Sequence, residues 1–355
     1  GAKLPIVMGV SFTFVTVLST VAVNYGYPAV IGAVLVGGIF EGTLGLLAKY
    51  WRRIISPIVA ASVVTAIGFS LFTVGARSFG GGYVEDFGSA ENLLLGTVTL
   101  IVCLTWNCMA KGYLKQLAVL AGLVVGYLVA ILMGKVDLTV IFADGIIALP
   151  KLLPYTPEFN VGAIFSVCII YLVSAAETIG DTTAMVASGL NREITDNEIS
   201  GSLACDGYSS AVSSLFGCPP VTSFSQNVGL VTMTKIVNRF ALSIGAIFLV
   251  ICGLFPKVGA IISMMPQPVL GGAAIIMFSS IVVSGIQLIT KEPLSARNIS
   301  IVSVALGVGY GLGANAGALS GLPQGIQLIF GGSGIVPACL VAILMNVLLP
   351  KEKEA

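Results

Sequence analysis

Long apolar runs separated by short charged stretches fill almost the whole chain. A helix needs about 20 apolar residues to cross the hydrocarbon core of a bilayer. Two of the runs, 198–216 and 219–234, are short for this and rich in Gly, Ser and Pro. The pattern predicts twelve membrane-spanning segments, at roughly 5–24, 29–47, 54–75, 92–110, 116–134, 160–181, 198–216, 219–234, 240–256, 265–289, 298–316 and 328–349.

Composition supports this picture. Of the 355 residues 56% are hydrophobic and 9% are charged, whereas a soluble domain carries about 25% charged residues. The 43 glycines fit membrane helices, where small residues let backbones approach closely. A net charge of +1 gives no indication of nucleic-acid binding, and we expect the lipid bilayer as the surrounding medium.

Lys and Arg gather in alternate loops, as they do on the cytoplasmic side of membrane proteins. Four single basic residues fall in the other loops: Arg77, Lys135, Lys151 and Lys257. We therefore predict a multi-pass protein of the cell (inner) membrane with both termini cytoplasmic and a short tail at 351–355. With Lys3 inside, the inside loops are Lys49–Arg53, Lys111–Lys115, Arg192–Glu198, Lys235–Arg239, Lys291–Arg297 and Lys351–Lys353.

Two segments interrupt the plain apolar pattern. In Gly217–Gly229 paired prolines cannot continue a helix, and the following Val-Thr-Ser-Phe favours extended backbone, so a helix is expected only near Gln226. Met8–Val15 is also polar, β-branched and aromatic at membrane depth. Broken segments at corresponding places of two halves indicate a transporter binding site.

Two carboxylates, Glu177 and Asp181, stand one helical turn apart in an apolar run and share a helix face. A carboxylate at membrane depth indicates a functional site by default. The alternative is a helix-end pair near the cytoplasmic interface. Asp206 begins a stretch of small residues, where it either caps a short helix or helps to organise the site.

Amides and aromatics complete the candidate site. Gln226 and Asn227 open the helix that follows the extended stretch, where an amide suits the edge of a heterocycle or satisfies broken backbone. Phe12 and Phe224 flank the two interruptions and are expected either to pack or to stack on a flat ligand.

Histidine is absent, and the seven cysteines include no Cys-x-x-Cys pair. Any proton chemistry must then fall to carboxylates, and a metal site or a membrane-embedded enzyme is disfavoured. We expect no metal and no cofactor beyond a coupling ion, H⁺ or Na⁺.

Several motifs in order resemble the nucleobase–ascorbate transporters, also called nucleobase:cation symporter family 2. The most specific is Gln226-Asn-Val-Gly229 with Thr234 and Arg239 after it. Three further matches are Ala176–Asp181, Asp206-Gly207 and Ser11–Phe14, and Pro266–Ala273 resembles the start of the family's twelfth segment. The resemblance covers essentially the whole chain.

The resemblance implies an all-α polytopic fold of two inverted seven-segment repeats, like that of uracil permeases, with short strands in two broken helices. It implies a core domain at 1–47 and 160–256, and a gate domain at 48–159 and 257–350 through which a homodimer forms. Glu177 and Gln226 would bind the ring, backbone at Phe12 and Ser225 would contact it, and Phe224 would wall the pocket. Asn227 is placed in the same substrate set. Asp181, Asp206 and Glu177 would support the site or couple protons.

The function this implies is cation symport, with a proton as the expected ion, of a purine nucleobase, xanthine or uric acid. Uracil, another nucleobase or an anion is the alternative substrate; Gln226 matches purine carriers, whereas uracil carriers place Glu there. The first span matches the family's third segment, so about twelve of fourteen segments are expected and two N-terminal helices are expected to be missing. A non-transporting fragment is therefore a further alternative.

Overall fold

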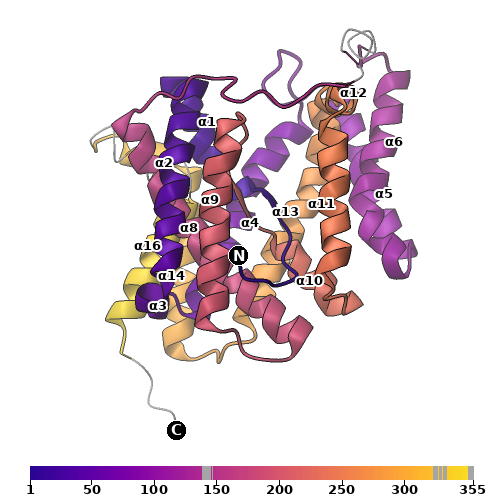
Figure 1. The fold of residues 1–355 in the computed structure, drawn as a ribbon. Coiled ribbons are helices and arrows are strands. Elements are labelled where there is room, and N and C mark those ends of the chain that lie inside the picture. The colour runs from indigo at the N-terminus through magenta and orange to yellow at the C-terminus, as the bar shows by residue number, and fades with distance from the viewer. Residues whose placement is uncertain (138–144, 146, 323–326, 328–329, 331–333, 351–355) are drawn as a thin grey trace. The chain divides into compact units, whose positions relative to one another are not determined.

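A computed structural model describes the chain except residues 138–144, 146, 323–326, 328–329, 331–333 and 351–355 (Figure 1). Packing divides it into two compact units. The first comprises Gly1–Ser70, Lys151–Leu242 and Ile281–Ala355, and the second comprises Leu71–Pro150 and Ser243–Ser280. The predicted tail at 351–355 lies outside the described residues. The boundaries expected for core and gate domains remain a prediction.

Helices make up most of both units, and each predicted span contains a helical element. Within the described residues, six helices are long and apolar enough to cross a membrane, or seven if the bent pair α11 and α12 counts as one span. The helices are α1 Val15–Tyr25, α2 Tyr27–Leu46, α3 Ala48–Trp51, α4 Pro57–Phe79, α5 Ala90–Met109, α6 Ala118–Leu132, α8 Val161–Met185, α9 Asp196–Leu215, α10 Ser225–Thr234, α11 Arg239–Gly253, α12 Pro256–Ser263, α13 Gln267–Ile289, α14 Ala296–Ala314 and α16 Ile335–Leu348.

Both predicted interruptions are extended, and they meet. Strand β1, Met8–Val10, pairs antiparallel with β2, Val221–Ser223, so that Gly9 lies opposite Thr222. Backbone bonds continue the pairing at both ends, from Ser11 N to Pro220 O at 3.4 Å and from Phe224 N to Val7 O at 3.0 Å. These bonds satisfy backbone groups that no helix satisfies here. The helix expected near Gln226 begins at Ser225, as α10.

Close packing of α2 on α9 holds the first unit together. Gly38, Gly42 and Gly45 of α2 lie directly against α9, which contributes Gly207 and Ala211, the Tyr208 ring, and Leu203 with Ala204, in that order. A Cβ built on Gly207 would lie 2.1 Å from the backbone nitrogen of Gly42, which no real contact allows. Because no side chain separates the backbones there, the two helices approach more closely than larger residues would permit.

Asp206 lies in the middle of α9, so its interpretation as a helix cap is wrong. The helix begins ten residues earlier, at Asp196, with Thr195 as N-cap. Thr195 and Glu198 form a capping box in which each side chain bonds the other's backbone N–H. The charged Thr195–Glu198 stretch supplied a stronger start signal than the aspartate did.

Loops predicted to share one face of the membrane do meet. Arg52, in the loop after α3, forms an ion pair with Asp196 at the start of α9. Lys135, in the second unit, is one of the four basic residues that fall outside the predicted inside loops. It forms ion pairs with Asp86 at 3.3 Å and with Glu91 at 2.6 Å. The hydrogen bond from Lys135 lowers the pKa of the Asp86 carboxyl. The positive charge of Lys135 is thus neutralised by nearby carboxylates. Which face is cytoplasmic remains a prediction.

Candidate functional site

The two broken segments place hydroxyl groups against the carboxylates of α8. Thr13, in the 3₁₀ turn Phe12–Phe14 after β1, donates to Glu177 Oε2 at 2.8 Å. Ser223 and Ser225, at the end of β2 and the start of α10, donate to Asp181 Oδ2 at 3.2 Å and 3.0 Å. Glu177 is 6% exposed. Both carboxylates are therefore buried inside the protein rather than paired at an exposed helix end.

Asp206 of α9 joins the same network. Thr178 of α8 donates to its Oδ2, and Thr222 of β2 donates to the same oxygen at 3.2 Å. The two threonine hydroxyl oxygens lie 3.0 Å apart. Strand β2 thus lies between two acid-bearing helices, with Asp181 bonded from one end of it and Asp206 from its middle. Three elements distant in the sequence converge on one polar cluster in an apolar unit.

Other predicted site residues take different places. The Phe224 ring lies over Gly9, where a built Cβ would come within 2.6 Å of the ring. Phe12 is 40% exposed, whereas its neighbour Phe14 is fully buried edge-on against Tyr171, with centroids 4.9 Å apart. The aromatic that anchors the first interruption is therefore Phe14, which sequence reasoning did not single out.

Two amide residues, Gln226 and Asn227, lie at the start of α10, and the structure describes the side chain of Asn227 but not that of Gln226. Asn227 is buried, and its Nδ2 donates to Pro5 O at 3.0 Å, so this amide ties the N-terminal segment to α10. It satisfies irregular backbone, which was one of its two interpretations; a contact with substrate stays a prediction. Gln226 belongs to α10, but its side chain lies outside what the structure describes.

Sequence reasoning overlooked Glu41, a carboxylate in the apolar helix α2. It is 0% exposed and lies in the same buried region as Asp206 and Glu177. The signal was present, because a charged residue inside a membrane-length apolar run marks a functional site by default. Helix α2 contains no interruption, so the charge of Glu41 is the signal that the sequence offers at this position.

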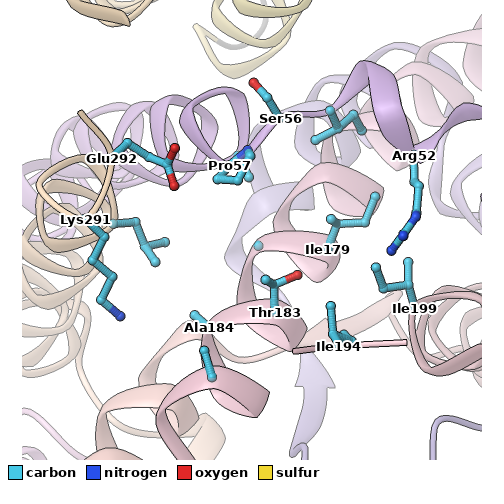
Figure 2. A pocket seen from close by; sticks show the side chains of 15 residues that line it. Arg52, Ser56, Pro57, Ile179, Thr183, Ala184, Ile194, Ile199, Lys291 and Glu292 are labelled. Atoms are coloured by element: carbon cyan, nitrogen blue, oxygen red, sulfur yellow. The ribbon is translucent and has the colours of Figure 1, made fainter. Parts of the chain in front are cut away.

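A cavity of about 610 Å³ borders the other side of α8 (Figure 2). Ile179, Gly180 and Thr183 line it from α8, next in sequence to Asp181. At its rim Arg52 stands on one side and Lys291 with Glu292 on the other, as Figure 2 shows. The rim thus comes from the predicted inside loops 49–53, 192–198 and 291–297. The cavity runs from those loops toward the helix that carries the site.

This cavity predicts a one-sided pattern of thiol labelling. In a background without the native cysteines, Thr183→Cys should react with a membrane-impermeant thiol reagent from the face bearing these loops, and not from the opposite face. Thr182→Cys is the matched control. Thr182 is fully buried and bonds Ser202 at 3.1 Å, so it should react at least about tenfold more slowly. Equal labelling of the two variants, or labelling only from the opposite face, would contradict the assignment.

In the described residues no group of three or more Cys, Asp or Glu side chains is arranged to hold a metal ion. The cluster offers carboxylates and hydroxyls, which can accept hydrogen bonds from a ligand and exchange protons among themselves.

The sequence is similar to a family of permeases and to individual bacterial permeases. A family model described as "Permease family" matches residues 1–316. Xanthine permease XanQ of Escherichia coli (strain K12) is 34% identical over 366 residues, covering 99% of this chain and 78% of that protein. Uric acid permease PucK of Bacillus subtilis (strain 168) is 33% identical over 353 residues, covering 98% and 81%.

Solved structures of low sequence identity share the fold. The transmembrane domain of a cyanobacterium bicarbonate transporter, BicA, superposes with a TM-score of 0.60 at 16% identity, covering 97% of this chain and 84% of that one. SLC26A9 gives 0.59 at 14% identity, covering 97% and 57%. At such low sequence identity, the likeness shows a shared fold only. That fold confirms the predicted class of polytopic helical membrane protein.

Proposed function

The chain belongs to this permease family, and from that premise we propose that it imports a purine nucleobase, xanthine or uric acid, by symport with a cation. Permeases are transporters, so the chain is a multi-pass membrane transport protein and the enzyme alternative is wrong. The observation that carries the proposal is the meeting of β1 and β2 beside the buried carboxylates of α8.

Purine-diones present alternating N–H and C=O groups along a flat ring. Glu177, held by Thr13 on one oxygen, is suited to accept from ring N–H groups. In this proposal Gln226 pairs with a neighbouring N–H/C=O edge. Backbone at Phe12 and Ser225 meets the ring's carbonyl oxygens, and Phe224 walls the pocket. Asn227, at the start of the same helix, contributes to the substrate site by holding the N-terminal segment in place through its hydrogen bond to Pro5 O.

The coupling ion in this proposal is a proton, carried by the carboxylates Glu177, Asp181 and Asp206. The chain contains no histidine, so carboxylates are the side chains available for proton exchange at depth. Hydroxyl donors on each of the three stabilise the ionised form, and burial favours the neutral form. Sodium is the alternative coupling ion. Purine accumulation that requires Na⁺ and proceeds without a pH gradient would identify Na⁺ as the coupling ion.

The wider assembly is proposed from the same resemblance. Core and gate domains, at 1–47 with 160–256 and at 48–159 with 257–350, would rock against each other to alternate access. A homodimer would form through the gate domain, in the cell (inner) membrane, with both termini cytoplasmic. The cavity beside α8 would then be the route to the cytoplasm.

A thermal-shift panel of nucleobases on the purified protein tests the substrate class. Ligands stabilise the folded state by mass action, by about 2.7 kcal/mol at a hundred times Kd. We expect xanthine or urate to raise the melting temperature, and Gln226→Ala to remove that rise. Gln287→Ala, an exposed amide on α13, should leave it intact. Stabilisation by uracil or by an inorganic anion alone would overturn the purine assignment.

A further inference from the structure

The cavity beside α8 lies between residues of the proposed core domain and residues of the proposed gate domain. The core side includes Ile179 and Thr183 of α8 and Ile199 of α9. The gate side consists mainly of residues from the segments 52–57 and 288–292. Both sides belong to one compact unit of the structure. If core and gate rock against each other, as the proposed function requires, the width of this cavity changes.

An ion pair joins the two sides at the rim of the cavity. Arg52 lines the cavity from the gate side, and its Nη2 pairs with Oδ1 of Asp196, the first residue of α9, on the core side. By contrast, the ion pair of Arg192 with Glu198 lies within the core. Figure 2 shows Arg52 on one side of the cavity and Lys291 on the other. The contact of Arg52 with Asp196 thus fastens the gate to the core along one side of the cavity.

This ion pair is accessible to water. The side chains of Arg52 and Asp196 are 31% and 42% exposed. An ion pair with that exposure is weak, and dissolved salt screens it further. It can therefore break and re-form as the domains move. A contact that is made in one conformation and broken in another shifts the equilibrium between the two.

The gate segment that carries Arg52 is held more firmly from the other side. Asn346 of α16 donates from Nδ2 to Ile54 O at 2.9 Å, and its Oδ1 accepts from Ser56 Oγ at 3.0 Å. Arg297 of α14 donates from Nη2 to Asn346 O at 2.6 Å and to its Oδ1 at 2.9 Å. Charge-assisted hydrogen bonds of this kind are roughly twice as strong as neutral ones. All four residues belong to the proposed gate, so the segment moves with the gate.

We propose that the ion pair of Arg52 with Asp196 is a latch between core and gate that stabilises the conformation in which the cavity is open to this face. The hydrogen bonds around Asn346 are the anchor that fixes the gate end of the latch. Transport then requires the latch to break once in each cycle, whereas the anchor stays intact. The proposal rests on the proposed function for its two domains, and it names the residues that control one of their two arrangements.

Distances between spin labels test the latch without any transport. The labels are placed at Glu193→Cys on the core and Lys291→Cys on the gate, both exposed, in lipid-reconstituted protein that lacks the native cysteines. We expect Arg52→Gln to change the ratio of two distance populations by about twofold to fivefold, the effect of losing a weak ion pair. Raising the ionic strength from about 0.01 M to about 1 M should shift the unaltered latch in the same direction. It should add no further shift in Arg52→Gln.

Lys49→Gln is the matched control, since it removes the same charge from an exposed residue of the neighbouring α3. It should leave the distance populations unchanged. The exchanged pair, Arg52→Asp with Asp196→Arg, should restore the original ratio. Distances in Arg52→Gln identical to those of the unaltered protein, or an equal shift in Lys49→Gln, would overturn the latch.

Cross-linking supplies the second readout. A cleavable bifunctional thiol reagent that joins Arg52→Cys to Asp196→Cys should stop purine uptake into proteoliposomes, and reduction should restore it. The same reagent across the anchor, between Ser56→Cys and Asn346→Cys, should leave uptake by that variant equal before and after linking. Continued uptake with the latch linked would overturn the proposal. If the unaltered protein moved no purine, the proposed function would fail, while the spin-label distances still decided whether the latch exists.

Discussion

Replacement of Glu177 by Gln is expected to weaken xanthine or urate binding by about tenfold to a hundredfold and to abolish accumulation. The variant keeps the size of the side chain and one oxygen for Thr13, which donates to Glu177 at 2.8 Å. It removes the charge and turns one acceptor into a donor that faces the ring's N–H groups. A hydrogen bond to a charged group contributes about 1.5–3 kcal/mol, and about 1.4 kcal/mol is tenfold in affinity.

Titration calorimetry on the purified protein measures this effect directly. Glu193→Gln is the matched control, since Glu193 is an exposed carboxylate in the loop before α9. It should bind purine with unchanged affinity. If Glu177→Gln bound and accumulated purine as the unaltered protein does, Glu177 would not be a substrate ligand, and the site would have to be sought elsewhere.

Adding one methyl group at Gly207 is expected to destabilise the protein by about 1–3 kcal/mol, the usual cost of overpacking. The Cβ of Gly207→Ala would meet the backbone of Gly42 and Gly38 at 2.1 and 2.5 Å. Backbone cannot rotate aside, so α2 and α9 must separate. We therefore expect the melting temperature of Gly207→Ala to fall.

Gly245→Ala in α11 is the control for helix propensity. A Cβ on Gly245 meets nothing within 4 Å. Alanine favours a helix over glycine by about 1 kcal/mol, so this variant should be as stable as the original or more so. Melting temperatures in one detergent compare the two. Equal stability of Gly207→Ala and Gly245→Ala would contradict the close packing of α2 on α9.

The sequence alone predicted the broken segments because their signals are local. Pro219 and Pro220 exclude a helix, and the extended stretch and the helix start at Ser225 follow within a few residues. The α8 carboxylates were also predicted, since Glu177 and Asp181 stand out in an apolar run. That the two strands pair, and that their hydroxyls bond those carboxylates, depends on contacts more than 160 residues apart in the case of Thr13 and Glu177.

Features that depend on packing were missed. The charge of Glu41 in apolar α2 is visible in the sequence, but only the fold shows that it is fully buried against other helices. Asp206 was open to interpretation as a cap, since Cys205-Asp-Gly looks like a helix start when Thr195 and Glu198 are not recognised as a capping box. Phe12 and Phe14 are equivalent in the sequence, and only the fold shows that Phe14 packs on Tyr171.

The central claim, transport of a purine by this chain, is tested most directly by uptake into proteoliposomes. The purified protein is reconstituted, and labelled xanthine and urate are offered with and without an imposed inward proton gradient. We predict accumulation that depends on the gradient and is lost in Glu177→Gln. No uptake of either purine by protein that is folded and correctly inserted, or uptake that the gradient does not change, would contradict the account.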